Sequence, residues 1–393
     1  RLGRHALLER LALAGAQVVH AEETDAVTGC EGLYAVDMPA PALKALTAAV
    51  EDGNPLGRLW DMDVLSPDGA KLERPEPRRC LVCGRPVHAC ARSRTHTVEE
   101  LQKATAALLT RSLNESDART AAALATRALL YEVCVTPKPG LVDRANSGSH
   151  RDMDVYTFMA SSASLWPYFY RCVLVGRDTA GLEAPQTLAA LRQPGISAEC
   201  DMRRATGGAN THKGAIYSMG LVCGALGRLE TESWAWPERV LAEVAAMAAG
   251  SVARELGGSE GKTAGQRIYA RHGIAGVRGE AEAGFPSVLQ RGLPVLEEGL
   301  SLGKSPDEAG AAALLAVLAA TADTNLIARG GIEGQARAAV QARALLDRLP
   351  WPDAAAIRAL DRAFIAENLS PGGSADLLAL CWMLHFLKKE TQL

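Results

Sequence analysis

From about residue 114 to its end, the chain alternates alanine- and leucine-rich segments with short glycine-rich junctions. The apolar residues of these segments recur with helical spacing, and their composition favours helix over strand. One segment opens with Ser305, a proline and Glu308, the arrangement of a capping box, and we expect this helix to run to about Ile327. In the last segment Ser374 is a candidate helix cap. The second part of the chain is therefore predicted to be an all-α domain with glycine-rich inter-helix loops.

The first part of the chain has a different pattern, with short extended runs separated by turns. The runs predicted to be extended are residues 17–19, 32–36 and 58–65, and residues 41–50 are predicted to form a helix. Residues 99–116 contain no glycine or proline, so the two parts are expected to be joined by a helix. We predict a mixed fold, with a partial α/β domain over residues 1–105 and an all-α domain over residues 106–393.

Composition excludes several classes of protein. The formal net charge of −3 over 393 residues gives no indication of nucleic-acid binding or of an anionic membrane partner. The nine cysteines follow no disulfide framework and no signal peptide is visible, which favours the reducing cytoplasm. The longest apolar run, residues 309–322, is too short to span a bilayer. The chain starts with an arginine inside a helix-like pattern, so we expect an N-terminally shortened product.

The junction ATGGANTHKG, residues 205–214, is rich in both glycine and polar side chains. Its glycines allow the backbone to approach a ligand closely, and a lysine and a helix-forming run follow. Free N–H groups at a helix start favour anions, so this junction predicts a phosphate-binding loop, with an ordinary polar loop as the alternative. The spacing differs from G-x-x-x-x-G-K-[ST], which excludes a standard P-loop.

Further junctions join glycine or proline to a charge at the edge of an apolar helical segment. They are TPKPGLVDR at 136–144, GVRGE at 276–280, DTN with RGG within 323–331, and NLSPGGSAD at 368–376. In this order, the junctions resemble those of the ATP:dephospho-coenzyme A triphosphoribosyl transferases, over a stretch from about residue 121 to the end. The resemblance implies that the ribose 2′-hydroxyl of 3′-dephospho-CoA displaces adenine from ATP, forming the precursor of the citrate lyase prosthetic group.

Such a displacement has an oxocarbenium-like transition state. It needs a base for the hydroxyl, an acid or hydrogen bond for the adenine, and a clamp on the triphosphate that remains attached. The residues expected to bind the substrates are Lys138, Arg144, Gly207, Gly208, Asn210, Lys213, Arg278, Arg329, Gly372 and Gly373. The catalytic candidates in this part of the chain are Asp143, His212, Glu280 and Asp323.

Acidic residues at the ends of apolar segments supply the candidate carboxylates. They are Glu132, Asp143, Asp152, Asp154, Glu199, Glu280, Glu282, Asp323 and Asp376. Asp152 and Asp154 could hold Mg²⁺ or act only as helix N-caps, and Asp323 could be catalytic or form a buried ion pair with an arginine such as Arg329. His150 and His212 could each act as a base or as a hydrogen-bond donor.

In the first part, Asp61 and Asp63 alternate on a run expected to be extended, which would place both carboxylates on one face. Such a pair could bind Mg²⁺ on a triphosphate, or one aspartate could cap the following turn. Further along, Cys80, Cys83, Cys90 and His96 could form a structural Zn²⁺ site, although His96 could instead bind phosphate. Lysine and arginine outnumber acids from residue 71 to residue 96, which suits a polyanionic substrate, an acidic carrier protein, or merely a solvated face.

Three segments of the first part are similar to the citrate lyase holo-acyl-carrier-protein synthases: GRLWDMDVL at 57–65, RRCLVC at 78–83 and CARSRTH at 90–96. That family is related to the nucleotidyltransferase fold and transfers phosphoribosyl-dephospho-CoA to a serine of the acyl carrier protein, with release of pyrophosphate. The arginine-rich start of the family and its Pro-Gly/Lys segment have no counterpart here. We therefore expect a chain that makes the precursor and transfers it poorly.

Two other functions remain open at this level. One is an all-α metal-dependent hydrolase of the ADP-ribose type, and the other is a non-catalytic coenzyme-binding protein. The phosphate-binding character of the junctions favours the transferase, because that enzyme retains the triphosphate.

Overall fold

The computed structural model of the chain describes residues 1–27, 29–74, 76–257, 263–347 and 351–390. The chain divides into two compact units, Arg1–Glu115 and Ser116–Leu393. The connecting helix predicted over residues 99–116 is present as α4 (Val98–Cys134), which contributes residues to both units. The predicted boundary after residue 105 lies inside this helix.

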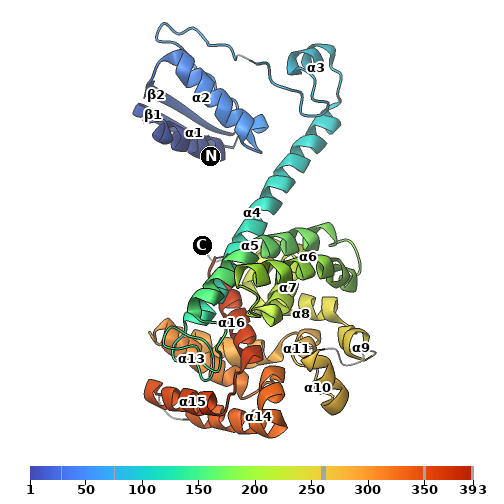
Figure 1. Ribbon diagram of the computed structural model, residues 1–393. Helices are drawn as coiled ribbons and strands as arrows, with labels where there is room; N and C mark the ends of the chain where they lie inside the picture. The colour runs from blue at the N-terminus through green and yellow to red at the C-terminus, as the bar shows by residue number, and fades with distance from the viewer. Residues whose placement is uncertain (28, 75, 258–262, 348–350, 391–393) are drawn as a thin grey trace. The chain divides into compact units, whose positions relative to one another are not determined.

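The first unit contains a small antiparallel sheet with helices before and after it (Figure 1). Its elements are α1 (Leu2–Leu13), β1 (Gln17–Ala26), β2 (Gly29–Asp37), α2 (Ala40–Gly53), η1 (Gly57–Leu59), α3 (Val87–Ser93) and the start of α4. The strands pair from Gln17 with Asp37 to Ala26 with Gly29. Helix α1 packs against α2 and β1. The extended runs at 17–19 and 32–36 and the helix at 41–50 are thus confirmed, and the small sheet is compatible with a partial α/β domain.

The strand predicted over residues 58–65 is wrong. Among the described residues, 60–64 pair with no strand, and Leu65 forms only an isolated bridge with Lys71. The backbone here is bound by side chains of α2 instead: Met62 N donates to Glu51 Oε1 (2.7 Å), and Lys44 Nζ donates to Met62 O (3.1 Å). These side chains satisfy polar groups that a strand partner would otherwise bind.

The second unit is helical, with no strand among its described residues. Its elements after α4 are α5 (Val155–Asp178), α6 (Ala184–Ala205), α7 (Lys213–Arg228), η2 (Thr231–Ala235), α8 (Pro237–Ala248), α9 (Ser251–Leu256), α10 (Ala264–His272), α11 (Val277–Glu282), η3 (Val288–Gly292), α12 (Leu293–Ser301), α13 (Pro306–Leu318), α14 (Thr324–Leu346), α15 (Ala354–Ala366) and α16 (Gly372–Glu390). This confirms the all-α prediction. No described helix is both long and apolar enough to cross a bilayer.

The core of the second unit forms around α7, α13 and α16, whose residues are buried around most of the helix circumference. Helices α5 and α7 pack closely because glycines lie at their contact. A Cβ on Gly176 would lie 2.1 Å from Gly224 O, and one on Gly227 would lie 2.1 Å from Val173 O. A helix that is buried on all sides needs apolar residues on all sides, which explains why these three segments contain few polar residues.

The capping box of Ser305 and Glu308 is confirmed, since Glu308 N donates to Ser305 Oγ (3.2 Å) and Ser305 N to Glu308 Oε2 (3.0 Å). However, the helix ends at Leu318 rather than at about Ile327. A new helix, α14, starts after Asp323, whose side chain accepts hydrogen bonds from the first backbone N–H groups of that helix. This cap separates α13 from α14, and residues 321–323, which lie between the two helices, line the candidate site.

Candidate functional site

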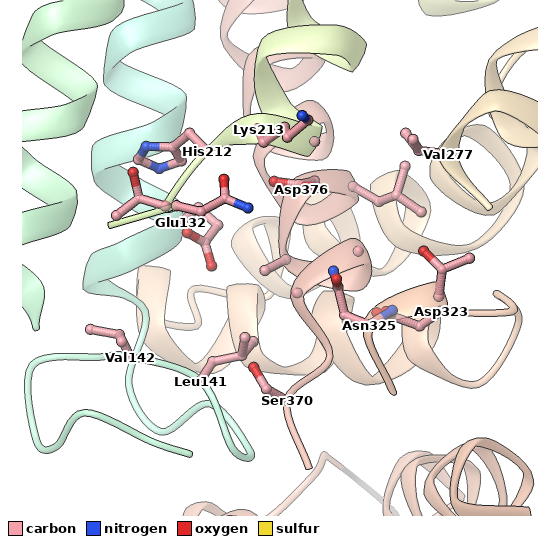
Figure 2. Close-up of a pocket in the computed structure, with 18 of the residues that line it drawn as sticks. Glu132, Leu141, Val142, His212, Lys213, Val277, Asp323, Asn325, Ser370 and Asp376 are labelled. Carbon is pink, nitrogen blue, oxygen red and sulfur yellow. The ribbon is translucent and has the colours of Figure 1, made fainter. Parts of the chain in front are cut away.

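A cavity of about 440 Å³ lies in the second unit (Figure 2). The first residues of four helices line it, namely Lys213 of α7, Val277 of α11, Thr324 of α14 and Gly372 of α16. The end of α4 and the loop after it also contribute to the lining, as do the segments that precede α5, α7, α14 and α16. The N–H groups of a first helical turn lack intrahelical partners and carry the positive end of the helix dipole. Helix starts that converge in this way favour an anionic ligand.

The cavity brings together predicted site residues from four of the glycine-rich junctions and from the loop before α5. Those in its lining are Lys138, Asp152, Asn210, His212, Lys213, Asp323, Arg329, Gly372 and Gly373. The predicted residues that lie outside its lining are Asp143, Arg144, Asp154, Gly207, Gly208, Arg278 and Glu280.

Two of the outlying acids organise the chain near the cavity. Asp143 is buried and accepts from the backbone N–H groups of Lys138 (3.0 Å), Ala145 (2.7 Å) and Asn146 (3.0 Å), so it shapes the loop that carries Lys138. Asp154 is the N-cap of α5, with Thr157 N donating to its Oδ1 at 2.9 Å. The cap role left open for Asp154 in the sequence is therefore present in the structure.

The other outlying residues have partners elsewhere. Arg144 forms an ion pair with Asp307, and Glu280 accepts from Ser287 Oγ (2.6 Å) and N (3.2 Å). Gly207 and Gly208 have φ values of 65° and 104°, a region that favours glycine, so they allow the turn that leads into α7. Arg278 lies in a neighbouring hollow.

Glu132, near the end of α4, is a buried carboxylate of the cavity. Lys138 Nζ donates to its Oε1 (2.5 Å) and to its backbone oxygen (2.7 Å), and both side chains are almost fully buried. Burial raises the pKa of Glu132, and the ammonium of Lys138 opposes that rise. Lys138, which was predicted to clamp phosphate, thus also neutralises an acid at the wall of the cavity.

Asp323 connects two helix starts rather than pairing with Arg329. Its Oδ1 accepts from Asn325 N (2.8 Å), and its Oδ2 accepts from Ser374 N (2.7 Å) and Ser374 Oγ (2.9 Å). Ser374 is therefore a donor to Asp323 and not the cap of α16. Burial raises the pKa of Asp323, while these donors favour its ionised form. With both oxygens engaged, Asp323 holds α14 and α16 together at the cavity.

Asp376, in the first turns of α16, faces the start of α7. A Cβ on Gly214 would lie 1.8 Å from Asp376 Oδ2, so a larger residue at position 214 would displace the Asp376 carboxyl group. Burial, together with the nearby Glu132 and Asp323, raises the pKa of Asp376 well above its ordinary value. A cationic ligand or transition state next to this carboxyl group would therefore stabilise its ionised form.

His212, the N-cap residue of α7, is buried and neutral. Burial, with Lys138 nearby, lowers its pKa to about 3. Ser161 Oγ accepts a hydrogen bond from Thr211 Oγ1 (2.7 Å) and lies 2.7 Å from His212 Nδ1, so its own proton is free to be donated to Nδ1. A neutral imidazole that accepts at Nδ1 carries its proton at Nε2. Among the described residues, His212 Nε2 has no hydrogen-bond partner, and it is therefore available as a donor.

Two cations lie at the cavity with their positions defined by contacts. Lys213 Nζ lies 3.0 Å from Glu199 Oε2. Arg329 donates to Ser149 O (2.9 Å) and to Asn368 Oδ1 (3.1 Å), which joins three segments of the lining region. The side chain of Asp152, two-thirds exposed, lies near His150 with 3.9 Å between Oδ1 and Nδ1.

From the sequence, Glu132 and Asp376 are not distinguishable from the other acids at helix ends, and Ser161 is not identifiable as a site residue. A signal for the two acids is available in retrospect, because each interrupts a short apolar stretch, residues 128–135 for Glu132 and residues 375–384 for Asp376. Ser161 carries no such signal, since its role depends on contact with His212, 51 residues away.

In the first unit, Asp61 and Asp63 are exposed and each is next to a cation. Arg78 Nη2 lies 3.1 Å from Asp61 Oδ1, and Lys71 Nζ lies 2.5 Å from Asp63 Oδ2. Arg78 also pairs with the buried Glu51. The two aspartates therefore lie in the basic surroundings predicted from the sequence, although not on a strand.

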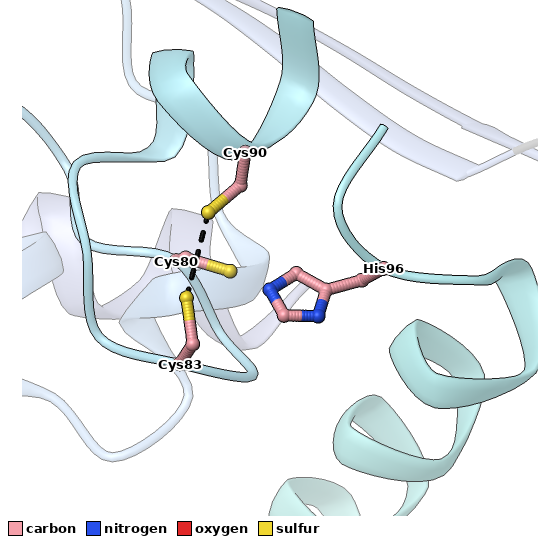
Figure 3. Close-up of side chains that lie close together, drawn as sticks. All are labelled: Cys80, Cys83, Cys90 and His96. Carbon is pink, nitrogen blue, oxygen red and sulfur yellow. Dashed lines mark hydrogen bonds between the residues drawn. The ribbon is translucent and has the colours of Figure 1, made fainter. Parts of the chain in front are cut away.

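The predicted Cys/His cluster of the first unit is present (Figure 3). The ligand atoms of Cys80, Cys83, Cys90 and His96 all lie within 4.8 Å of one another. The first two cysteines are on a tight turn in which Gly84 N donates to Cys80 O (3.0 Å), and Cys90 is on α3. The pKa of Cys83 is lowered to about 5, chiefly by the Arg85 side chain, which favours a thiolate.

Each of the two units matches a known protein family. Residues 118–393 match the family described as ATP:dephospho-CoA triphosphoribosyl transferase, and residues 2–112 match apo-citrate lyase phosphoribosyl-dephospho-CoA transferase. All residues that line the cavity fall within the first of these ranges.

Relatives include a protein similar to most of the chain and proteins similar to its second part. The protein CitXG of Haemophilus influenzae is 38% identical over 371 residues, which cover 90% of this chain and 78% of that protein. The 2-(5″-triphosphoribosyl)-3′-dephosphocoenzyme-A synthase of Pectobacterium atrosepticum is 45% identical over 266 residues, 67% of this chain and 87% of that protein. A probable synthase of the same name from Vibrio cholerae is 43% identical over 271 residues, with the same two coverages of 67% and 87%. The chain therefore belongs to the ATP:dephospho-CoA triphosphoribosyl transferase family and carries, ahead of that domain, a domain of the apo-citrate lyase phosphoribosyl-dephospho-CoA transferase family.

Proposed function

We propose that the cavity of the second unit transfers the triphosphoribosyl group of ATP to the 2′-hydroxyl of 3′-dephospho-CoA and releases adenine. One observation carries this proposal: helix starts and carboxylates with raised pKa values meet in a single cavity. The helix starts attract phosphate groups, and the carboxylates stabilise the positive charge that develops on the ribose as the bond to adenine breaks.

Asp376 is the residue best suited to accept the proton of the attacking hydroxyl. Its raised pKa makes it a stronger base than an ordinary aspartate once it is ionised, and ionisation is favoured by positive charge on the substrate ribose. The bond from the 2′-oxygen to C1 of the ATP ribose forms while the bond from C1 to the adenine nitrogen breaks. The hydroxyl proton passes to the Asp376 carboxylate, and the electron pair of the broken bond leaves with adenine. The adenine nitrogen then takes a proton from solvent, and Asp376 returns its proton to solvent, so the net result is neutral adenine and an ionised Asp376.

His212 supplies a hydrogen bond for the departing base. Since its pKa is about 3, the ring stays neutral at physiological pH and donates from Nε2 without acting as a cation. A neutral donor in a buried site stabilises negative charge on the purine and has little tendency to lose its position, because Ser161 holds the other ring nitrogen. Ser161 and Thr211 are in this view positioning residues.

Lys213, Arg329 and the N–H groups of the helix starts would hold the triphosphate. A Mg²⁺ ion accompanying it fits Asp152, because this carboxylate is exposed and Mg²⁺ commonly binds one or two carboxylates together with substrate phosphates. When bound, Mg²⁺ neutralises part of the phosphate charge. Asp323 and Glu132 would act indirectly. Asp323 would hold the starts of α14 and α16 in place, and Glu132 would hold the ammonium group of Lys138.

The test is adenine release by the 393-residue protein, measured by liquid chromatography with and without 3′-dephospho-CoA. We expect adenine only with the acceptor, together with a product whose mass equals both substrates minus adenine. Adenine formed equally well without acceptor would instead indicate hydrolysis, and absence of adenine under both conditions would leave a coenzyme-binding protein.

For the first unit, we infer transfer of phosphoribosyl-dephospho-CoA to a serine of the citrate lyase acyl carrier protein, with release of pyrophosphate, on a fold related to the nucleotidyltransferases. Asp61 and Asp63 are exposed carboxylates suited to Mg²⁺ on a triphosphate, with Arg78 and Lys71 close enough to contact its phosphates. Mass spectrometry of the carrier protein tests this. Asp61→Asn should abolish whatever labelling the unaltered protein gives, including the weak labelling expected from the sequence. Asp68→Asn, a change at an exposed aspartate on the next turn, should leave that labelling unchanged, and equal loss in both variants would contradict the assignment.

We also infer that Cys80, Cys83, Cys90 and His96 bind a structural Zn²⁺. Three cysteines and one histidine form a common tetrahedral ligand set, in which ligand atoms lie about 3.5–4 Å apart when the bonds are about 2.0–2.3 Å long. The Cys83–Cys90 sulfur distance of 3.4 Å and the 4.8 Å spread of the group are compatible with that geometry. Zinc would join the turn, α3 and the segment before α4.

A further inference from the structure

A second hollow, of about 520 Å³, adjoins the proposed ATP cavity. The two share Lys213, Gly214 and Val277 in their linings, so they meet at the starts of α7 and α11. We propose that this hollow binds the diphosphate of 3′-dephospho-CoA, the acceptor substrate, while the first cavity binds ATP. This inference rests on the proposed transfer reaction, which requires two nucleotide sites that meet at the reacting ribose groups.

The two spaces differ in the balance of their acidic and basic side chains. The cationic side chains of the hollow are Arg192, Lys213, Arg254 and Arg278, and its carboxylates are Glu199 and Glu255, which leaves two positive charges in excess. The first cavity has more acidic than basic side chains: Glu132, Asp152, Asp323 and Asp376 against Lys138, Lys213 and Arg329. An internal diphosphate ester carries two negative charges at neutral pH and matches the hollow. A triphosphate that arrives with Mg²⁺ suits the more acidic cavity.

The arginines of the hollow are held ready for a ligand. Glu255 accepts from Arg192 through Oε1 (2.9 Å) and from Arg278 through Oε2 (2.7 Å). The Arg278 guanidinium also lies over the ring of Tyr217, 5.1 Å from its centroid. A guanidinium has five N–H donors in a fixed plane, so an arginine that pairs with one carboxylate can still bind a phosphate oxygen. Arginines fixed in this way lose little side-chain entropy on binding.

Apolar surface beside the cations suits the rest of the acceptor. Ile196, which is half exposed, lines the hollow together with Leu188 and Tyr217. A ligand that combines a diphosphate with a largely uncharged tail can cover this surface while its phosphates contact the arginines. Lys213 lies in both linings and can contact the phosphates of either substrate.

The experiment measures the two substrates separately by calorimetric titration of the 393-residue protein, since the proposed reaction needs both. Arg192→Glu reverses an exposed charge of the hollow. Arg337→Glu is the matched control, because Arg337 is also exposed and paired with a glutamate, Glu367, but lines neither space. We expect Arg192→Glu to raise the Kd for 3′-dephospho-CoA by about 10-fold or more, with the Kd for Mg–ATP unchanged. Arg337→Glu should change neither.

A second variant, Arg278→Ala, removes the guanidinium that donates to the other carboxylate oxygen of Glu255. It should likewise raise the Kd for 3′-dephospho-CoA and leave the Kd for Mg–ATP unchanged. The inference is overturned if either hollow variant weakens Mg–ATP binding instead, or if 3′-dephospho-CoA binds both variants as it binds the unaltered protein. Failure of the proposed function has a different signature. In that case the unaltered protein would release no adenine when both substrates are present, whatever the variants bind.

Discussion

The buried, neutral state of His212 predicts a defined dependence of stability on pH. The pKa of His212 is about 3 in the folded protein, whereas an unfolded histidine has a pKa of about 6.5. Between these two values the unfolded chain binds a proton that the folded chain does not. Stability attributable to this residue is therefore present above pH 6.5 and is lost as the pH falls toward 3.

The size of the effect follows from the two pKa values. At pH 5.0 the unfolded histidine is almost fully protonated and the folded one is not, which lowers the free energy of unfolding by about 2 kcal/mol relative to pH 7.5. His212→Gln keeps an N–H donor and removes the titration. The variant should therefore lose about 2 kcal/mol less than the unaltered protein over this pH interval.

The assay is urea unfolding at pH 7.5 and 5.0, followed by tryptophan fluorescence. Of the six tryptophans only Trp60 lies outside the second unit, so the signal reports mainly on the unit that contains His212. Other acids titrate in both proteins and cancel in the comparison. Parallel losses of stability in the two proteins would refute the lowered pKa of His212 in the folded protein.

Three further predictions concern single side chains. Lys213→Ala should lower kcat/KM for ATP by about 10- to 100-fold through loss of a charge-assisted phosphate contact, and unchanged steady-state kinetics would remove Lys213 from the clamp. Asp376→Asn should lower kcat by about 100-fold or more. Because the pKa of Asp376 is raised, kcat/KM of the unaltered protein should fall as the pH is lowered through that raised value, and a flat pH profile would exclude Asp376 as the base. Elemental analysis of purified protein should find about one zinc per chain that is lost in Cys83→Ser, and a metal-free unaltered protein would contradict the zinc assignment.

Local patterns in the sequence were sufficient for most of the helical segments, for the capping box at Ser305 and for the cysteine cluster, whereas the predicted cap at Ser374 was wrong. The capping box of Ser305 and Glu308 involves residues three apart, and Cys80, Cys83, Cys90 and His96 lie within one short segment. Interactions over so few residues are set by the local chain, so their geometry can be inferred without the rest of the fold. The helical second part was predictable for the same reason, because the spacing of apolar residues reports on local conformation.

Tertiary contacts decided where helices stop and which acids meet. The apolar segment after Ser305 has no local signal strong enough to end it at Leu318; the break exists because Asp323 caps α14 and binds Ser374, 51 residues away. Asp61 and Asp63 were predicted to lie on a strand, but side chains of α2 bind the backbone of Met62, the residue between them, instead of a strand partner. Likewise, Glu132 and Asp376 face one cavity although more than two hundred residues separate them. A sequence identifies acids that end apolar helices, whereas their raised pKa values arise from the shared burial that only the folded chain creates.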